Sequence, residues 1–312
     1  MVPMRALVWT AEGTAGWLDG LDERLEIAEV PADPLSDPRL TEVRVLIPPL
    51  MRNSADEPYS LATVLERMKS LEFVQAQSAG VDNLVDAVPS GVLLCSVRGA
   101  YDELVAELLL TGILGIYKEV PHYVRAQDRG EWSPKQVRVV QGKTVLYVGY
   151  GSISKCLERY LEPFQVKTLK VARTKRDDIE SMDALPELLP RADIVVVLTP
   201  LTDETRGMVN EAFLGRMKPG ALLVNGARGA CVNTEALLAA TRERGIEAYV
   251  DVTDPEPLPA GHPLWSAPGV FVTPHIGSLV ADHRERCFRV IRENLMAWID
   301  GGQPKNRVEY GY

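Results

Sequence analysis

The sequence lacks the features that mark membrane proteins, secreted proteins and nucleic-acid-binding proteins. Its longest uncharged apolar stretch near a helix, Leu108 to Tyr117, is far shorter than the roughly 18 residues of a membrane span. Its start, Met1 to Trp9, does not have the charged-then-apolar layout of a signal peptide. Acidic residues outnumber basic ones by 43 to 34, and the net charge is −9. A surface that follows phosphates needs clustered Lys and Arg, so we expect neither a nucleic-acid partner nor a membrane partner.

Cysteine is scarce as well. The four cysteines, Cys95, Cys156, Cys231 and Cys287, are scattered without CxxC spacing. In a chain of this size without a secretory signal, this pattern favours reduced thiols in the core. We therefore expect a cytoplasmic protein without a disulfide framework and without a metal site.

Short β-branched runs alternate with helical segments along the chain, which predicts α/β architecture with parallel sheets. The 312 residues are enough for two domains that each bury a core. The clearest helices are expected at 60–69, 101–118 and 281–300. Strands are expected at 6–9, 25–29, 43–47, 73–77 and 92–96, and then at 144–148, 168–171, 194–198, 221–225, 247–250 and 270–273.

The helix expected at 101–118 is followed by a polar segment. The helix is too apolar for a free surface helix, so we expect it between domains or between subunits. Residues 121–134 contain two prolines and many polar side chains, and we expect an irregular arm or linker that protrudes. Because a monomer rarely exposes a large apolar face, these two segments predict a homodimer.

A glycine-rich turn at Gly149-Tyr150-Gly151-Ser152-Ile153 is the clearest nucleotide-binding motif. It follows an apolar strand and precedes a helix, which is the context that a dinucleotide site requires. Gly149 permits the tight turn, and Gly151 lets the backbone approach a pyrophosphate at the helix N-terminus. The third glycine of the usual fingerprint is replaced by Ser154, which weakens the motif without removing it. A plain strand-to-helix turn is the alternative.

The end of the next strand bears on the choice of cofactor. An NAD site usually places Asp or Glu there, about 20 residues after the glycines, to accept from the ribose hydroxyls. This sequence instead has Arg173-Thr174-Lys175-Arg176. An Arg can bind a ribose 2′-phosphate with paired hydrogen bonds, helped by the Thr hydroxyl and the following basic residues. We therefore expect NADP to be preferred and NAD to be possible. A solvated basic loop is the alternative.

Four histidines, His122, His262, His275 and His283, are the candidates for a titrating acid or base. Of these, His275 ends an apolar strand and is followed directly by a turn of small residues. The C-terminal ends of parallel strands are where α/β enzymes place their chemistry. A structural histidine with satisfied hydrogen bonds is the alternative.

Two more charged residues follow strand ends, Arg228 in a Gly-flanked turn and Glu256 between two prolines. With His275 they form a plausible site for reduction of a carbonyl. The Arg would bind a carboxylate and polarise the adjacent carbonyl, the His would give the proton, and the Glu would stabilise the imidazolium. Ordinary surface ion pairs are the alternative for Arg228 and Glu256.

Taken in order, these motifs resemble the D-isomer-specific 2-hydroxyacid dehydrogenases, particularly the glyoxylate/hydroxypyruvate reductase branch. The resemblance covers nearly all of the chain and is strongest from Gly142 to Gly277. There are two departures from the family pattern. Ser154 replaces the third glycine, and Asn233 stands where many relatives have Asp. After the glycine turn the matching motifs are Leu198-Thr199-Pro200-Leu201-Thr202, Thr205-Arg206-Gly207, Met217-Lys218-Pro219-Gly220, Ala227-Arg228-Gly229, Glu256-Pro257-Leu258-Pro259, His262-Pro263-Leu264-Trp265 and Pro274-His275-Ile276-Gly277.

The resemblance implies a fold and a function. The fold is two Rossmann-like, doubly wound parallel-sheet domains: a flavodoxin-like substrate domain from residues 1–97 and 283–312, and an NAD(P)-binding Rossmann domain from residues 98–282. The function is hydride transfer between NADP(H) and a 2-oxo acid and D-2-hydroxy acid pair, with glyoxylate or hydroxypyruvate types favoured. Closure of a hinge would exclude water from the hydride path.

The resemblance also implies residue roles beyond Arg228, Glu256 and His275. In the first domain, the Ser78-Ala79-Gly80-Val81-Asp82 loop would hold the substrate carboxylate through its backbone, with a bare turn as the alternative. Met51 and Arg52 would set pocket size, and Trp132 resembles an aromatic that in some relatives reaches the partner's active site. The cofactor set would include Leu198, Thr199 and Pro200 on the adenosine side, Asp251 at the nicotinamide carboxamide, and Thr205, Ala227 and Gly277 around them.

Two other functions stay open on the sequence alone. A dinucleotide-sensing scaffold or corepressor on the same fold can keep the same three residues. A relative acting on formate or phosphite is the other possibility. Such relatives generally carry additional active-site residues or extensions that this chain does not show.

Overall fold

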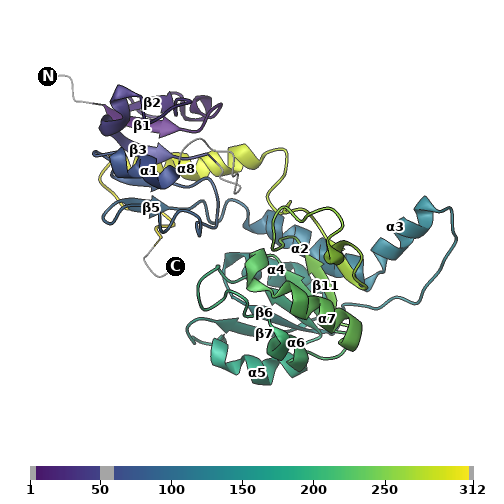
Figure 1. The fold of residues 1–312 in the computed structure, drawn as a ribbon. Helices are drawn as coiled ribbons and strands as arrows, with labels where there is room; N and C mark the ends of the chain where they lie inside the picture. Colours follow the sequence, from purple (N-terminus) through teal and green to yellow (C-terminus); the bar gives the residue numbers. More distant parts are fainter. Residues whose placement is uncertain (1–4, 50–59, 309–312) are drawn as a thin grey trace. The chain divides into compact units, whose positions relative to one another are not determined.

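The computed structural model describes residues 5–49 and 60–308, and the chain divides into two compact units. Unit 1 consists of residues 1–101 and 280–312, and unit 2 consists of residues 102–279 (Figure 1). The predicted domain boundaries, 97/98 and 282/283, differ from these divisions by a few residues. Met51 and Arg52 lie outside the described residues.

Unit 1 is built on a five-stranded parallel sheet in the order β2-β1-β3-β4-β5. This is the strand order of flavodoxin-like folds. Its helices include α1, Leu61–Arg67, and α8, His283–Ile299. The strands are β1 Ala6–Thr10, β2 Leu25–Glu29, β3 Val43–Ile47, β4 Phe73–Gln75 and β5 Leu93–Cys95.

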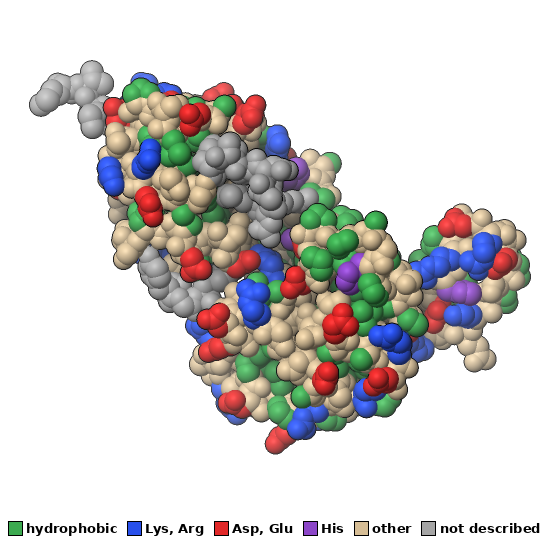
Figure 2. Space-filling model, in the orientation of Figure 1, with side chains coloured by type: hydrophobic (Ala, Val, Ile, Leu, Met, Phe, Trp, Pro, Cys, Tyr) green, Lys and Arg blue, Asp and Glu red, His purple; other side chains and the backbone are tan. Residues whose placement is uncertain are grey.

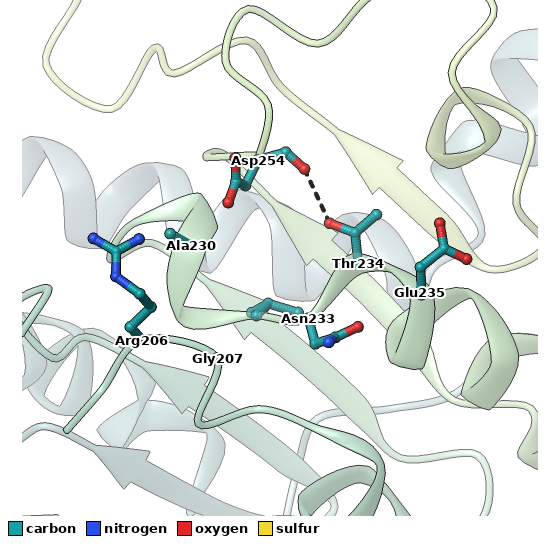
Figure 3. Close-up of a pocket in the computed structure, with 8 residues that line it drawn as sticks. Arg206, Gly207, Ala230, Asn233, Thr234, Glu235 and Asp254 are labelled. Atoms are coloured by element: carbon teal, nitrogen blue, oxygen red, sulfur yellow. Dashed lines mark hydrogen bonds between the residues drawn. The ribbon is translucent and has the colours of Figure 1, made fainter. Parts of the chain in front are cut away.

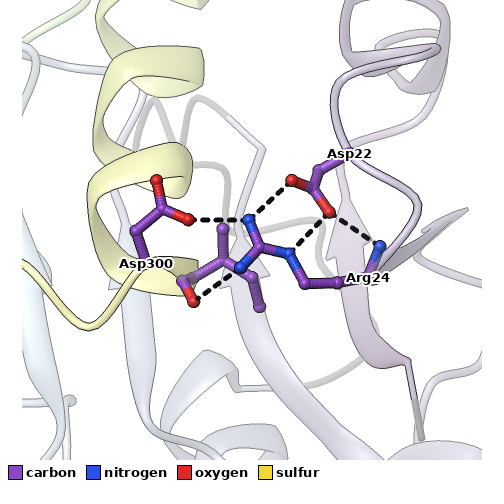
Figure 4. A network of polar contacts seen from close by, with 4 residues as sticks. Asp22, Arg24 and Asp300 are labelled. Atoms are coloured by element: carbon purple, nitrogen blue, oxygen red, sulfur yellow. Dashed lines mark hydrogen bonds and ion pairs between the residues drawn. The ribbon is translucent and has the colours of Figure 1, made fainter. Parts of the chain in front are cut away.

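An arginine links the end of α8 to the start of β2 in unit 1 (Figure 4). The Arg24 Nη2 atom lies 2.7 Å from an oxygen of Asp22 and 2.7 Å from an oxygen of Asp300. Its Nη1 also donates to the carbonyl of Ile299 at 3.4 Å. A cation near the last carbonyl groups of a helix stabilises the C-terminal end of the helix. This contact therefore joins the C-terminal helix to the sheet of the N-terminal segment.

Unit 2 is built on a seven-stranded parallel sheet in the order β12-β11-β10-β9-β6-β7-β8. Read from its first strand, this is the Rossmann order with one added strand. The strands are β6 Thr144–Val148, β7 Lys167–Ala172, β8 Glu180–Ser181, β9 Ile194–Val197, β10 Leu222–Asn225, β11 Glu247–Val250 and β12 Val270–Val272. The helices are α2 Asp102–Tyr117, α3 Val120–Asp128, α4 Ser152–Leu161, α5 Leu185–Leu188, α6 Glu211–Arg216 and α7 Thr234–Arg244.

The central strands of unit 2 are apolar because helices cover both faces of the sheet. All four residues of β9 and of β10 are buried, and these strands are apolar without alternation except for Asn225 at the end of β10. The predicted α/β fold with two doubly wound parallel sheets is confirmed.

One expectation about the arm is wrong. Residues 121–134 were expected to be irregular, but Val120–Asp128 forms the helix α3. Pro121 stands in its first turn, where the missing N–H has no partner to lose, so the proline starts the helix and does not break it. Figure 1 shows α3 standing away from the sheet of unit 2.

No helix in the described ranges is long and apolar enough to cross a bilayer. On the face drawn in Figure 2, acidic and basic side chains are interspersed over both units.

Candidate active site

The glycine-rich turn stands between β6 and α4. Gly149 has a φ of +92°, and a Cβ there would lie 2.7 Å from the backbone of Leu198, so the position requires glycine. A Cβ at Gly151 would meet nothing within 4 Å, so open space faces the backbone at the helix start. The first helical hydrogen bond runs from the amide of Lys155 to the carbonyl of Gly151. The preceding amides, including those of Ser152 and Ile153, are therefore available to an anion, and the turn fits a pyrophosphate.

Ser154 takes the place of the third glycine and is fully buried. Its hydroxyl donates to the carbonyl of Gly149 at 2.6 Å. The hydroxyl thus has a hydrogen-bond partner within the turn. The small serine side chain lets the helix pack against the strand, as a glycine would. The departure from the fingerprint leaves the turn intact.

The end of β7 carries the predicted basic loop. Arg173, Thr174 and Lys175 are exposed. The Lys175 ammonium lies 2.7 Å from an oxygen of Glu180, which partly neutralises it. Arg176, for which the sequence indicates only a supporting role, donates to the carbonyl of Tyr150 at 3.2 Å. The basic loop therefore contacts the glycine-rich turn through Arg176.

The residues after β9 adjoin the same turn. The amide of Leu198 donates to the carbonyl of Val148 at 2.8 Å, and Thr199 is buried. The hydroxyl of Thr205 donates to the carbonyl of Pro200 at 2.6 Å and accepts from the amide of Thr202 at 2.8 Å. Thr205 therefore fixes this loop from within.

A buried asparagine that belongs to none of the predicted site residues shapes the turn after β10. The Asn225 amide group donates to the carbonyl of Arg228 at 3.0 Å and accepts from the amide of Ala227 at 3.1 Å. Its position at a strand end, three residues before the arginine, was the available signal. Because Asn225 binds the backbone at both residues, it fixes the backbone position from which the Arg228 side chain projects.

Gly229 brings the Arg228 turn against the next loop. A Cβ at Gly229 would lie 1.9 Å from the carbonyl oxygen of Thr253 and 2.6 Å from the amide nitrogen of Asp254. No side chain fits there, so the two backbones pack directly. This contact couples the position of Arg228 to the loop that carries Glu256.

The predicted pair of Glu256 and His275 is formed. The Nδ1 atom of His275 lies 2.6 Å from an Oε atom of Glu256, and both side chains are a little over one-third exposed. Partial burial raises the pKa of Glu256, but the hydrogen bond and charge of His275, together with the charge of Arg228, lower it below its ordinary value. Glu256 is therefore a carboxylate at neutral pH, facing the imidazole.

Asp251 follows β11 and is buried. One of its oxygens accepts from the amide of Ile276 at 2.9 Å and the other from the amide of Gly277 at 3.1 Å. The resemblance assigned Asp251 to the nicotinamide carboxamide, which stays a prediction. In the structure its carboxylate holds the loop that carries His275.

An open hollow of about 420 Å³ borders the Glu256 loop on its α7 side. The hydroxyl of Thr234, at the start of α7, donates to the carbonyl of Asp254 at 3.1 Å (Figure 3). Asn233 caps α7 by accepting from the amide of Ala236 at 2.9 Å, as the Asp of relatives would. Helix α7 thus anchors the loop that precedes Glu256. The hollow is lined by Arg206, Gly207, Ala230, Val232, Asn233, Thr234, Glu235 and Asp254.

The predicted substrate loop belongs to unit 1. The Ser78 hydroxyl donates to the carbonyl of Gly80 at 2.7 Å, and the Ser78 carbonyl accepts from the amide of Val97 at 3.1 Å. Ser78, Ala79 and Gly80 are each partly buried. Their role toward a carboxylate stays a prediction. The structure brings Arg228, Glu256 and His275 together within unit 2.

The chain matches known proteins over this part and beyond it. The family model described as D-isomer specific 2-hydroxyacid dehydrogenase, NAD binding domain, matches residues 110–277. A glyoxylate reductase of Thermofilum pendens is 32% identical over 278 residues, which are 82% of each chain. A chloroplastic/mitochondrial formate dehydrogenase of Arabidopsis thaliana is 32% identical over 258 residues, covering 78% of this chain and 67% of that one.

A solved structure is similar over almost the full length. It is a D-isomer specific 2-hydroxyacid dehydrogenase of Xanthobacter autotrophicus Py2 in complex with NADPH and MES. It is 30% identical, has a TM-score of 0.82, and the match covers 98% of both chains.

Proposed function

The chain belongs to the D-isomer specific 2-hydroxyacid dehydrogenases and is an NAD(P)-dependent dehydrogenase, and we propose that it reduces a 2-oxo acid of the glyoxylate or hydroxypyruvate type with NADPH. The observation that carries this proposal is the 2.6 Å contact between His275 and Glu256, with Arg228 close enough to lower the pKa of Glu256. A cation, a carboxylate and an imidazole are the groups that reduction of a 2-oxo acid needs.

Each of the three residues has one task. Arg228 binds the substrate carboxylate, and its charge draws electrons from the neighbouring carbonyl. His275 donates its Nδ1 proton to the hydrogen bond with Glu256, so Nε2 is the atom that transfers a proton to the carbonyl oxygen. Glu256 stabilises the protonated ring and fixes its orientation. When bound in the glycine-rich turn, NADPH supplies the hydride.

The preference for NADPH rests on the end of β7. Arg173 stands where an acid would accept from the ribose hydroxyls, and no acid lies at that strand end before the turn at Asp177. Arg176 holds the basic loop to the carbonyl of Tyr150, beside the expected pyrophosphate. The relative from Xanthobacter autotrophicus, which contains NADPH, supports the same preference.

The substrate class is supported by the relatives named glyoxylate reductase. The test is a panel of glyoxylate, hydroxypyruvate, pyruvate, phenylpyruvate and branched 2-oxo acids, each with NADPH and with NADH. We expect the highest kcat/KM with glyoxylate or hydroxypyruvate and NADPH. The highest value with a bulky 2-oxo acid would contradict the substrate proposal.

Oxidation of formate is a second candidate, favoured by the similarity to the Arabidopsis thaliana formate dehydrogenase. Formate carries no 2-oxo group, so His275 would have no carbonyl oxygen to protonate. Formate with NADP⁺ and with NAD⁺ therefore completes the panel. Turnover of formate above that of every 2-oxo acid would favour this candidate.

We also propose that the protein is a homodimer in the cytoplasm. The arm formed by α3 and residues 129–140 exposes Trp132 to 96%, Val139 to 55% and Val124 to 52% of their surfaces. Apolar side chains gathered on one projecting segment suit burial against a second copy, and Trp132 is the residue proposed to reach the partner's site. The four free cysteines suit a reducing compartment.

A further inference from the structure

His275 has a backbone conformation that a histidine seldom adopts. Its φ is +52°, in the left-handed region. Such a residue keeps this conformation only when its surroundings hold it, and residues of this kind gather at active sites. The His275 amide donates to the carbonyl of Asp251 at 2.7 Å, and the next two amides donate to the Asp251 carboxylate. Three consecutive amides of the loop thus depend on one aspartate.

Asp251 accepts from the hydroxyl of Thr273, which is itself hydrogen-bonded to the hydroxyl of Tyr249. The Thr273 hydroxyl donates to an oxygen of Asp251 at 2.6 Å and lies 2.8 Å from the hydroxyl of Tyr249. Because the threonine has a single hydroxyl proton and gives it to the carboxylate, Tyr249 must donate to Thr273. Burial raises the pKa of Tyr249 to about 12, so the phenol keeps the proton that it donates at neutral pH. Tyr249 therefore donates to Thr273, and Thr273 donates to Asp251.

The tyrosine ring is closely packed. Tyr249 is fully buried in the core of unit 2, and its ring centroid lies 5.5 Å from that of Phe271. A Cβ at Gly112 of α2 would lie 2.2 Å from its ring, so the helix packs directly on the aromatic face. The place of the Tyr249 hydroxyl is therefore set by the packing of α2 on β11.

We propose that Tyr249 and Thr273 are positioning residues for His275, which fix its imidazole at the reacting carbonyl through Asp251. This inference rests on the proposed role of His275 as proton donor. Proton transfer depends steeply on placement, and a shift of about 1 Å far from the chemistry can lower turnover about a hundredfold. This series of hydrogen bonds links Tyr249, in the core of the sheet, to His275, the proposed proton donor.

The test removes the hydroxyl groups and leaves Asp251 in place, because Asp251 is itself a candidate for contact with the cofactor. Thr273→Val and Tyr249→Phe each delete one oxygen with little change of shape, and Thr273→Ser restores the hydroxyl. We measure kcat and KM with the best 2-oxo acid of the panel, the Kd of NADPH by fluorescence, and Tm. We expect Thr273→Val to lower kcat by about 10- to 100-fold with KM changed less, Tyr249→Phe to lower it less, and Thr273→Ser to recover most of the loss.

Two matched controls lie in the same unit. Thr241→Val removes a buried hydroxyl that, among the described residues, bonds only to the carbonyl of Leu238 in its own helix. Tyr147→Phe removes a buried hydroxyl without a hydrogen-bond partner in the part of the chain that the structure describes. Both should keep the wild-type kcat.

The outcomes separate the inference from the proposed function. If His275→Ala keeps half of the wild-type rate, the proposed function fails. If His275→Ala is inactive while Thr273→Val and Tyr249→Phe keep the wild-type kcat, the function stands and the inference is overturned. A loss that Thr273→Ser does not repair, or that Thr241→Val shares, overturns it as well. Should Thr273→Val not fold, Tyr249→Phe decides alone, since it leaves the packed ring unchanged.

Discussion

The Nδ1 atom of His275 lies 2.6 Å from Oε1 of Glu256, and the two residues are 19 positions apart in the chain. They follow different strands, since Glu256 comes after β11 and His275 after β12, and these strands pair side by side. Adjacent parallel strands bring their C-terminal loops to one edge, which is how the acid reaches the imidazole. With Nδ1 committed to the carboxylate, Nε2 is the ring nitrogen left for proton transfer in the proposed mechanism.

The first prediction tests the proton donor. His275→Ala should lower kcat by about 10²- to 10⁴-fold, the range that general acid catalysis contributes, and leave NADPH binding close to that of the wild type. Steady-state kinetics and fluorescence titration measure the two quantities. His262→Asn is the control, because Asn can accept at the helix cap where His262 Nδ1 accepts from the amide of Leu264. A His275→Ala enzyme with half the wild-type rate would remove this residue from the mechanism.

The second prediction concerns Glu256. Glu256→Gln replaces the carboxylate that accepts from Nδ1 of His275 with an amide of the same shape, so kcat of reduction at pH 7 should fall while KM for the 2-oxo acid changes less. Steady-state kinetics measure the two constants. An unchanged kcat would mean that the pair seen in the structure does not serve catalysis.

The same variant has a signature in stability. The pKa of Glu256 lies below the ordinary 4.5 in the folded state, so the interactions of its carboxylate stabilise the fold above pH 4.5, and this contribution is lost as the pH falls through the folded pKa. The Tm difference between wild type and Glu256→Gln should therefore be present at pH 7 and vanish toward pH 3. Because both side chains are partly exposed, the difference should be small.

The third prediction tests the cofactor preference. Arg173→Asp places an acceptor for ribose hydroxyls where a phosphate would bind, and it should bring kcat/KM for NADPH and NADH toward parity. The wild type should favour NADPH over NADH by about one to three powers of ten in kcat/KM, which corresponds to about 1.4 to 4 kcal/mol. Arg191→Asp makes the same change of charge at an exposed position elsewhere in unit 2. A wild type that prefers NADH would show that the basic loop does not select the phosphate.

The fourth prediction uses the contact between two loops. Gly229→Ala places a methyl group 1.9 Å from the carbonyl oxygen of Thr253 and must separate the two backbones. Both Arg228 and Glu256 then move, so KM for the 2-oxo acid should rise and kcat should fall together. Gly215→Ala in α6 is the control, because its Cβ meets nothing within 4 Å. That variant should keep full activity and gain up to about 1 kcal/mol in stability.

The fifth prediction concerns the arm. Light scattering at micromolar concentration should give twice the mass of the 34.4 kDa chain. The double variant Val124→Asp and Trp132→Asp places charges on the exposed apolar face of the arm and should give single chains. Leu279→Asp changes an exposed apolar residue outside the arm and should leave the mass unchanged. A wild type of 34.4 kDa would contradict the homodimer.

The fold was largely predictable because its central strands are buried on both faces. A run such as Ile194–Val197 has no polar position, and its β-branched residues identify a central parallel strand. Helix α3 was not predicted, because Pro121 in a polar segment suggests a loop until its place in the first turn is known. The two-residue strand β8 depends on pairing with β7 and has no pattern of its own.

The site was predictable only in part. Arg228, Glu256 and His275 carry charge or titrate and follow strand ends, so the sequence points to them directly. Asn225 and Thr273 are uncharged and belong to no motif. Their roles depend on the hydrogen-bond distances from Asn225 to Arg228 and from Thr273 to Asp251. Spacing along the chain does not contain those distances.

The packing of α2 on β11 has a consequence for sequence variation. Gly112 and Tyr249 share one volume, because a Cβ at residue 112 would lie 2.2 Å from the ring. The two positions should therefore covary in size: a relative with a larger residue at 112 must have a smaller one at 249. Such a lineage loses the phenol together with the glycine, and its loop after β12 must be held by other means. The pair is inherited as a unit or exchanged as a unit.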